Sequence, residues 1–278
     1  MFRRLAILAV RTTLFAVVAM VLLLVGCQSR IIYYPRSYNA IEVRTAERSG
    51  AQKLELQTSQ GKQVAFFFPA KAAEPAKPLG SKLWIVTGGN GSLALDYSYH
   101  REAWDPSASF LFFDYPGYGF CQGRPSPENI RETANALKVN LSHRFQLTAE
   151  RLTAQSAVLG HSIGAAAALI VAEEWGITRA VLLTPFTTLT EMARMTVGTP
   201  LCYLNHHRFD NIARLEALQK RGGTAEIFHG TEDEVIPVAM SRELAQRFPS
   251  IIKLHIVDGA MHNDILDLAQ KDIAEALR

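Results

Sequence analysis

Short apolar runs and longer amphipathic segments alternate along most of the chain. Strand-like apolar runs occupy residues 53–58, 63–69, 82–86, 109–115, 156–159, 180–183, 224–229 and 251–257. Helical patterns occupy residues 163–175, 237–248 and 263–277, and a further helix is predicted to begin at Pro127, behind the capping residue Ser126. Near-continuous apolar strands that alternate with helices are typical of a parallel sheet buried on both faces. The first two runs are separated by a short turn, which predicts an antiparallel hairpin at one edge.

The first 26 residues have a different pattern. A basic start is followed by an apolar stretch over residues 12–26, which at 1.5 Å per residue covers about 22 Å of a roughly 30 Å hydrocarbon core. A longer span that begins at Leu5 would place Arg11 inside the membrane. The pattern therefore favours a signal peptide over residues 1–26. Residues 24–27, Leu-Val-Gly-Cys, resemble a bacterial lipobox, in which a peptidase cuts before Cys27 and that cysteine carries lipid. The alternative is an uncleaved signal anchor.

Localisation and domain limits follow from that interpretation. We expect a lipid-anchored protein of the bacterial cell envelope, with residues 27–50 as an anchored N-terminal segment and residues 51–278 as the folded domain. By analogy with Gram-negative sorting, Gln28 after the cysteine favours the outer membrane, facing the periplasm. A disulfide between Cys121 and Cys202 is possible in this compartment, but the sequence does not place them within reach of each other.

Composition and charge narrow the classes of function. Hydrophobic residues make up 48% and charged residues 20% of the chain, as in ordinary globular proteins. The net charge of +3 comes from 29 basic and 26 acidic residues. Removal of Arg3, Arg4 and Arg11 with the signal peptide leaves 26 of each and a net charge of zero. With no basic stripe in the folded part, we expect no nucleic-acid partner.

The motif Gly-His-Ser-Ile-Gly at residues 160–164 follows a predicted strand and precedes a predicted helix. This strand–turn–helix context is the one in which a nucleophile elbow presents its serine. Ser162 is therefore the candidate nucleophile. The alternative is a helix-capping serine in an ordinary loop.

A serine hydroxyl needs a base, and in this type of site the base follows the acid near the end of the chain. Of the eight histidines, only His262 follows the last predicted strand. His161, His229 and His255 are interpreted as structural, and the adjacent pair His206 and His207 as solvated rather than metal-binding. Residues 232–234, Glu-Asp-Glu, follow the preceding strand, and Asp233 is the candidate acid, with Glu232 and Glu234 as solvated neighbours.

Backbone donors for a developing oxyanion complete the predicted site. One is the N–H of Ile163, directly after the nucleophile. The other is expected from the glycine-rich loop Gly-Gly-Asn-Gly at residues 88–91, where we assign the N–H of Asn90. The alternative is a flexible glycine turn.

Taken together, these motifs resemble the α/β-hydrolase superfamily, and within it a branch with a small lid that includes the eukaryotic α/β-hydrolase-domain depalmitoylases and bacterial relatives. The matching stretches lie at residues 32–35, 89–90, 114–119, 160–164, 185–187, 208–211, 229–233 and 262–264. Gly88 stands where the family usually has histidine, and Cys121 where it often has serine. The resemblance implies the α/β-hydrolase fold, with helices on both faces of a mostly parallel sheet and a small cap near residues 185–220.

The resemblance implies a serine hydrolase of an ester, a thioester or an amide that needs no cofactor or metal. We expect a small acyl ester, thioester or lipid as substrate, with the membrane reached through Cys27, and a monomer. Apolar residues of the cap either line the pocket or pack beneath it: Met192, Met195, Leu201, Tyr203 and Leu204. A peptidase for short peptides and a non-catalytic binding lipoprotein are the alternative functions.

Overall fold

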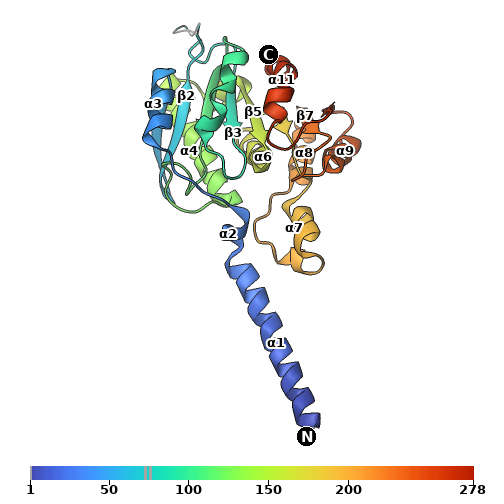
Figure 1. The fold of residues 1–278 in the computed structure, drawn as a ribbon. Coiled ribbons are helices and arrows are strands. Elements are labelled where there is room, and N and C mark those ends of the chain that lie inside the picture. Colours follow the sequence, from blue (N-terminus) through green and yellow to red (C-terminus); the bar gives the residue numbers. More distant parts are fainter. Residues whose placement is uncertain (1, 72–73, 75–76) are drawn as a thin grey trace.

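An eight-stranded sheet forms the centre of the computed structural model, which describes residues 2–71, 74 and 77–278 (Figure 1). The strands are β1 (Gln52–Thr58), β2 (Gly61–Phe68), β3 (Leu83–Thr87), β4 (Ser109–Phe113), β5 (Ser156–His161), β6 (Arg179–Leu183), β7 (Thr224–Gly230) and β8 (Ile252–Val257). Their order across the sheet is β1-β2-β4-β3-β5-β6-β7-β8. All eight predicted strands are present.

The sheet is antiparallel at one edge and parallel elsewhere. β2 pairs antiparallel with both β1 and β4, and every pairing from β4 to β8 is parallel. The predicted hairpin at the edge is confirmed. Because the strands from β3 onward run in one direction, the loops at their carboxyl ends meet along a single edge of the sheet.

Helices cover both faces, as predicted. The longer ones are α4 (Pro127–Phe145), α6 (Ile163–Trp175), α8 (Asn211–Lys220) and α9 (Val238–Arg247), which share one apolar core with the sheet. The opposite face is covered by α3 (Ala40–Arg48), the 3₁₀ segments η1 (Ala94–Tyr97) and η2 (His100–Ala103), and α10 (Ile265–Leu268) with α11 (Gln270–Ala276). A short helix, α5 (Ala149–Ala154), precedes β5. The expected single helix over 263–277 is wrong, because the chain breaks at Ala269.

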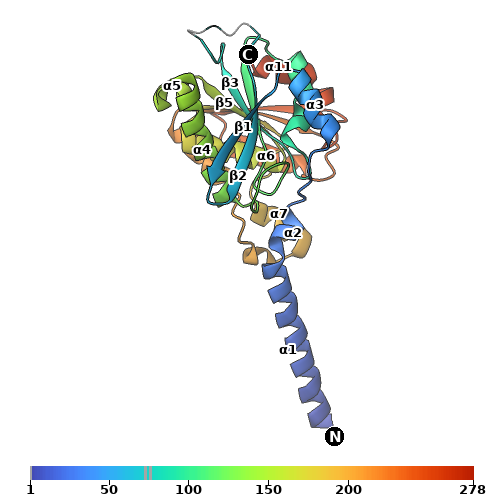
Figure 2. The same cartoon turned by 90° about the vertical axis from the view of Figure 1, so that its left-hand side faces the viewer.

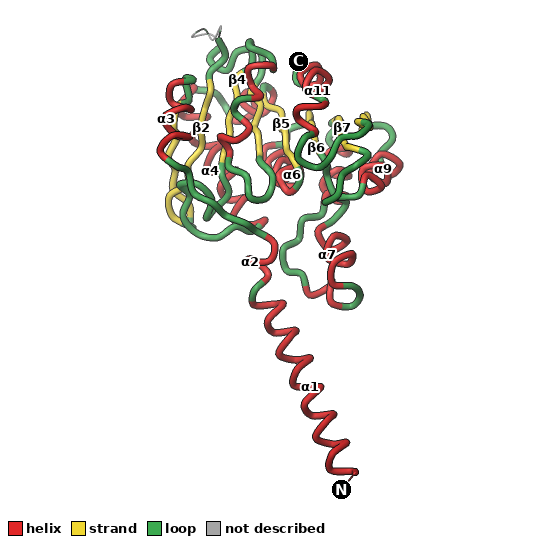
Figure 3. Tube along the Cα trace, viewed as in Figure 1, coloured by secondary structure: helices red, strands yellow, loops and turns green. Residues whose placement is uncertain are grey.

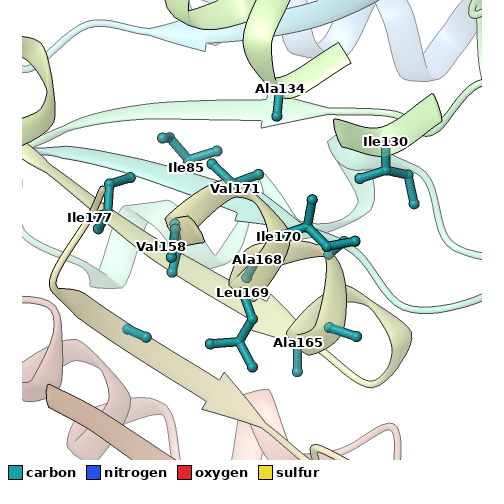
Figure 4. Close-up of a cluster of buried hydrophobic side chains, with 14 of the residues drawn as sticks. Ile85, Ile130, Ala134, Val158, Ala165, Ala168, Leu169, Ile170, Val171 and Ile177 are labelled. Atoms are coloured by element: carbon teal, nitrogen blue, oxygen red, sulfur yellow. The ribbon is translucent and has the colours of Figure 1, made fainter. Parts of the chain in front are cut away.

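Helix α6 is packed closely against the sheet. Its alanines Ala165 and Ala168 lie among Ile85 of β3 and Val158 of β5 (Figure 4). α4 packs beside α6 on the same face of the sheet, with Ile130 and Ala134. Small side chains let α6 lie near the strands, and this closeness sets the position of the turn that joins β5 to α6.

The N-terminal helices and the cap lie at one end of the molecule. Helix α1 (Phe2–Gly26) leaves the domain beside α2 (Gln28–Ile32) and the cap helix α7 (Leu189–Val197), as two perpendicular views show (Figures 1 and 2). The 3₁₀ segment η3 (Leu201–Leu204) completes the cap (Figure 3). Within the described residues, one helix is long and apolar enough to cross a membrane, over Phe2–Leu23. A signal sequence and a membrane anchor both have this character.

Candidate active site

The turn between β5 and α6 places Ser162 at the edge where the strand ends meet. Ser162 has a left-handed backbone, with φ 59° and ψ −124°. The turn tolerates no side chain on either flank. A Cβ at Gly160 would lie 2.2 Å from the carbonyl oxygen of Gly164, and a Cβ at Gly164 would lie 2.3 Å from that of Thr87. The glycines of the motif are therefore required by close backbone approach.

His262 lies between Ser162 and Asp233. Its Nε2 is 3.0 Å from the Ser162 Oγ, and its Nδ1 is 3.0 and 2.9 Å from the two carboxylate oxygens of Asp233. An ionised carboxylate only accepts hydrogen bonds, so Nδ1 must carry the proton and Nε2 is left to accept one from the serine hydroxyl. The structure thus brings together the three predicted residues in the geometry that an activated serine requires.

Asp233 is held by several donors. Its Oδ1 accepts the backbone N–H groups of Val235 and Ile236, at 2.9 and 2.7 Å, and its Oδ2 lies 3.1 Å from His229 Nε2. Burial alone would raise the pKa of Asp233, but the hydrogen bonds from His229, His262 and the Ile236 N–H hold this pKa well below its usual range. The carboxylate therefore stays ionised beside His262.

His229 does more than shape the turn after β7, the role expected from the sequence. Its Nε2 faces two acceptors, Asp233 and the Ile236 carbonyl oxygen at 2.8 Å, and its Nδ1 is 2.7 Å from Ser241 Oγ. Because both partners of Nε2 are acceptors, Nε2 carries a proton and donates it toward the carboxylate. In the sequence, the spacing His-x-x-x-Asp at residues 229–233 is the pattern that could have indicated this contact between His229 and Asp233.

Glu234 also lies closer to the site than expected for a solvated neighbour of Asp233. Its Oε2 accepts the backbone N–H of His262 at 3.2 Å, whereas the imidazole itself contacts Asp233. Glu232 and Glu234 are both exposed, as expected. The choice of Asp233 as the partner of the imidazole agrees with the geometry, and Glu234 supports the histidine through its main chain.

His161 connects three loops of the site. Its Nε2 donates to the His262 carbonyl oxygen at 2.9 Å, and its Nδ1 accepts from the Tyr97 hydroxyl at 2.8 Å. The same hydroxyl accepts the N–H of Gly89 at 2.8 Å. Burial, together with the neighbouring His262, lowers the pKa of His161 to about 4, so the ring is neutral at physiological pH. No sequence pattern had indicated Tyr97.

The predicted oxyanion donors both border the cavity beside Ser162. Ile163 and Asn90 line it together, and among the described residues neither backbone N–H donates to a protein acceptor. Both polar atoms of the Asn90 side chain are hydrogen-bonded. Its Oδ1 accepts from the Tyr34 N–H at 3.0 Å and the Tyr118 hydroxyl at 2.8 Å, and its Nδ2 donates to the Ile32 carbonyl oxygen. These bonds fix the loop and leave the backbone N–H free.

Gly88, where the family usually has histidine, is explained by Tyr97. A Cβ at position 88 would lie 2.7 Å from the Tyr97 ring. The aromatic ring therefore occupies the space that a larger residue would need. Tyr115 also donates to the Gly88 carbonyl oxygen, which further ties down this loop.

A cavity of about 390 Å³ opens beside Ser162 between the N-terminal segment and the cap. Its apolar lining consists of Ile31, Ile32, Ile163, Phe186, Leu189, Met192, Val197, Leu201, Leu204, Val235 and Ile236. Three of the five predicted cap residues are among them. Met195 and Tyr203 are not, because they point away from the cavity and are exposed.

The remaining cysteines and the histidine pair have structural surroundings. Cys121 and Cys202 are free thiols, and burial raises the pKa of Cys121 to about 12, which leaves its thiol unreactive. His207 was expected to be solvated, but it is half-buried and contacts Ser29 and Tyr33, at 3.3 and 3.0 Å. His206 is exposed.

The buried neutral ring of His161 predicts a loss of stability in acid. Between about pH 6.5 and pH 4 the unfolded chain binds a proton at His161 that the folded protein does not. The free energy of unfolding should therefore decrease by up to about 3 kcal/mol as the pH is lowered through this range. Chemical denaturation at several pH values measures this. His161→Gln should flatten the dependence and the exposed control His143→Gln should not. An equally steep dependence in His161→Gln would exclude this residue as the cause.

Sequence comparison identifies distant relatives, although no family model matches the chain. An uncharacterised protein of Mycobacterium tuberculosis is 25% identical over 252 residues, which cover 90% of this chain and 86% of that protein. The α/β-hydrolase domain-containing protein 17C of Xenopus tropicalis is 29% identical over 164 residues, or 59% of this chain and 50% of that protein. The chain thus matches only half the length of the latter relative.

Comparison with solved structures gives the fold. An esterase from Pyrococcus furiosus aligns with a TM-score of 0.64 at 16% identity, over 88% of this chain and 95% of that one. An α/β-hydrolase from Vibrio vulnificus aligns with a TM-score of 0.66 at 16% identity, over 87% and 88%. The chain is an α/β-hydrolase in fold, and by sequence it is a homologue of the α/β-hydrolase domain-containing 17 proteins.

Proposed function

We propose that this protein is a membrane-anchored serine hydrolase that cleaves carboxylic esters or thioesters through an acyl-enzyme on Ser162. The observation that carries the proposal is the alignment of Ser162, His262 and Asp233 at the wall of an apolar cavity. An esterase and a serine hydrolase homologue among the proteins of similar fold, and the homology to α/β-hydrolase domain-containing proteins, support it.

The reaction follows from the hydrogen-bond directions. His262 Nε2 takes the proton of Ser162 as its Oγ attacks the acyl carbonyl carbon, and the backbone N–H groups of Ile163 and Asn90 stabilise the oxyanion. The imidazolium then gives its proton to the departing alcohol or thiol. A water molecule repeats the attack on the acyl-enzyme, His262 again accepts and returns a proton, and the carboxylic acid leaves. Asp233 stabilises the imidazolium without taking its proton.

The lining of the cavity favours an acyl chain over a peptide. Its walls are mainly aliphatic, and apart from Ser162 few polar side chains line it, chiefly those of Gln28, Asn90, Thr196 and Asn205. A peptide backbone would leave its N–H and C=O groups unpaired against such walls, whereas an acyl chain has no polar groups to satisfy. This observation supports an esterase or thioesterase over the peptidase alternative.

Membrane attachment through Cys27 is part of the proposal. Cys27 directly follows the apolar helix α1 and is half-buried where α1 meets α2. The Leu-Val-Gly-Cys pattern supports lipidation of Cys27 after cleavage, and Gln28 supports the outer membrane as the destination. Several acyl chains on one cysteine would give stable anchoring, which a single chain would not.

The three aligned side chains should act as a unit. Ser162→Ala and His262→Ala should each abolish nearly all hydrolysis of a p-nitrophenyl ester, and Asp233→Asn should lower kcat about 10⁴-fold because it favours the wrong tautomer of His262. Glu234→Gln, the matched control, should cost less than about tenfold, since it contacts only the main chain of His262. A collapse in Glu234→Gln with Asp233→Asn near wild type would reverse the assignment of the acid.

His229 should support the reaction through Asp233. His229→Phe keeps the ring shape but removes the donor to the carboxylate, and losing a hydrogen bond to a charged group should lower kcat about tenfold with KM unchanged. The control is His255→Phe on the neighbouring strand, which contacts Glu226 at 2.8 Å instead. Steady-state kinetics on one short-chain ester compare the two variants. Equal effects of both substitutions would show that His229 contributes only to packing.

Lipidation should depend on Cys27. In a bacterial host supplied with labelled palmitate, the Cys27→Ala variant should incorporate no label and should accumulate with its signal peptide uncleaved. Cys202→Ala, which removes a buried thiol of the cap, should retain the label. Label in the Cys27→Ala protein would contradict the lipobox interpretation without affecting the proposed chemistry at Ser162.

A further inference from the structure

Exposed apolar side chains gather around the entrance of the candidate active site. Outside α1, large apolar residues with at least 39% of their surface exposed include six on the segments that border the cavity. We name this set the apolar rim, and it comprises Ile31, Tyr34, Met195, Val197, Tyr203 and Val235. Met195 and Tyr203 are 55% and 63% exposed, although they belong to the cap that covers the cavity. Exposed apolar side chains grouped beside a cavity are typical of a surface that contacts a partner or a ligand.

The location of the rim identifies a lipid bilayer as that partner. α2 and α7 lie at the end of the domain from which α1 departs (Figures 1 and 2). A lipid on Cys27 and a membrane-spanning α1 would both place the bilayer at this end. The rim residues on α2 and α7 therefore lie at the end of the domain that either anchor would bring to the membrane. Arg30, exposed on α2, adds a cation at the level of the lipid headgroups.

The segment that follows Cys27 is bound to the cap instead of forming a flexible tether. We call residues 28–34 the strap. Gln28 donates from its amide to the Leu204 carbonyl oxygen and accepts the His206 N–H at 2.8 Å. Ser29 and Tyr33 both contact the ring of His207. An anchor on Cys27 would thus hold the cap, and not only the chain terminus, at the membrane surface.

The strap also forms one wall of the cavity. Ile31 and Ile32 line it opposite the cap residues Met192 and Leu201. An acyl chain that enters between these walls would reach Ser162 along an apolar path. Ile31 belongs both to this path and to the apolar rim.

We propose that the apolar rim inserts into the lipid surface and that the cavity receives the acyl chain of a membrane-resident ester or thioester directly from the bilayer. The position of the rim is independent of the chemistry at Ser162, whereas the class of substrate rests on the proposed function. Other occupants of the rim, such as a second copy of the chain or a protein partner, are outcomes of the experiments below.

Insertion can be measured without any turnover. The three native tryptophans, Trp84, Trp104 and Trp175, are at most 4% exposed, so a tryptophan added at the surface reports its own surroundings. Mature lipidated protein that begins at Cys27 and carries Tyr203→Trp should lose fluorescence in vesicles of brominated phosphatidylcholine relative to the unbrominated lipid. Val139→Trp, at a position that is 61% exposed on α4, is the matched control and should be unaffected. Equal quenching at the two positions would overturn the insertion of the rim. Fluorescence of Tyr203→Trp that changes with protein concentration or with an added protein, and not with the brominated lipid, would overturn it as well.

Delivery of the chain from the bilayer is tested by comparing two substrates. Met195→Glu places a charge on the rim outside the lining of the cavity, and it should lower hydrolysis of a long-chain acyl thioester in vesicles about tenfold. Hydrolysis of a water-soluble short-chain ester should stay within about twofold of wild type, as it should for Val139→Glu on both substrates. An undiminished rate on the vesicle substrate, or a parallel loss on both substrates, would overturn the proposal.

The two measurements separate this inference from the proposed function. Quenching at position 203 in a protein that hydrolyses neither substrate would leave the membrane-inserted rim standing and refute the hydrolase. Hydrolysis that depends on Ser162 without quenching at position 203 would refute the rim and leave the hydrolase intact.

Discussion

The site depends on the close approach of helix α6 to the end of strand β3. A Cβ at Gly164 would collide with the carbonyl oxygens of both Thr87 and Gly88, and in its absence the Thr87 hydroxyl donates to the Gly164 carbonyl oxygen at 2.7 Å. This contact holds the left-handed turn at Ser162 beside the loop that begins at Gly88. Nucleophile and oxyanion loop are neighbours because the backbones touch, which explains why two glycines and a row of alanines are needed around a single serine.

Around that contact, polar groups connect the loops in an unbroken sequence. Gly89 donates to Tyr97, Tyr97 to His161, and His161 to the main chain of His262. On the far side, His229 and two backbone N–H groups hold Asp233. Hydrogen bonds keep Asp233 ionised, so the His262 imidazole beside it favours the tautomer with its proton on Nδ1. His161 is kept neutral by burial and holds the His262 main chain instead. The position of His262 beside the serine is thus fixed through its main chain by His161 and through its ring by Asp233.

Much of this could be predicted from the sequence, for identifiable reasons. The central strands β3 to β7 were visible because buried parallel strands are nearly continuous apolar runs, and Ser162, Asp233 and His262 were visible because each follows a predicted strand. Helix α3 was not predicted from the sequence. Its start is marked by a capping box of Asn39 and Glu42, which an analysis of apolar patterns does not detect. Contacts between distant segments determine the roles of Tyr97 and His207. They also determine that Met195 and Tyr203 point outward. Periodicity carries no information about those contacts.

The strap has a consequence for the order of events during biosynthesis. Gln28 is bound to Leu204 and His206, which are synthesised some 180 residues later, so this segment stays free until nearly the whole chain has emerged. A processing enzyme needs the residues around its cleavage point in an extended form within its own active site. Once Gln28 has docked on the cap, Cys27 is half-buried and this form is no longer accessible. Under the proposed lipobox interpretation, cleavage before Cys27 would therefore precede the docking of Gln28 on the cap.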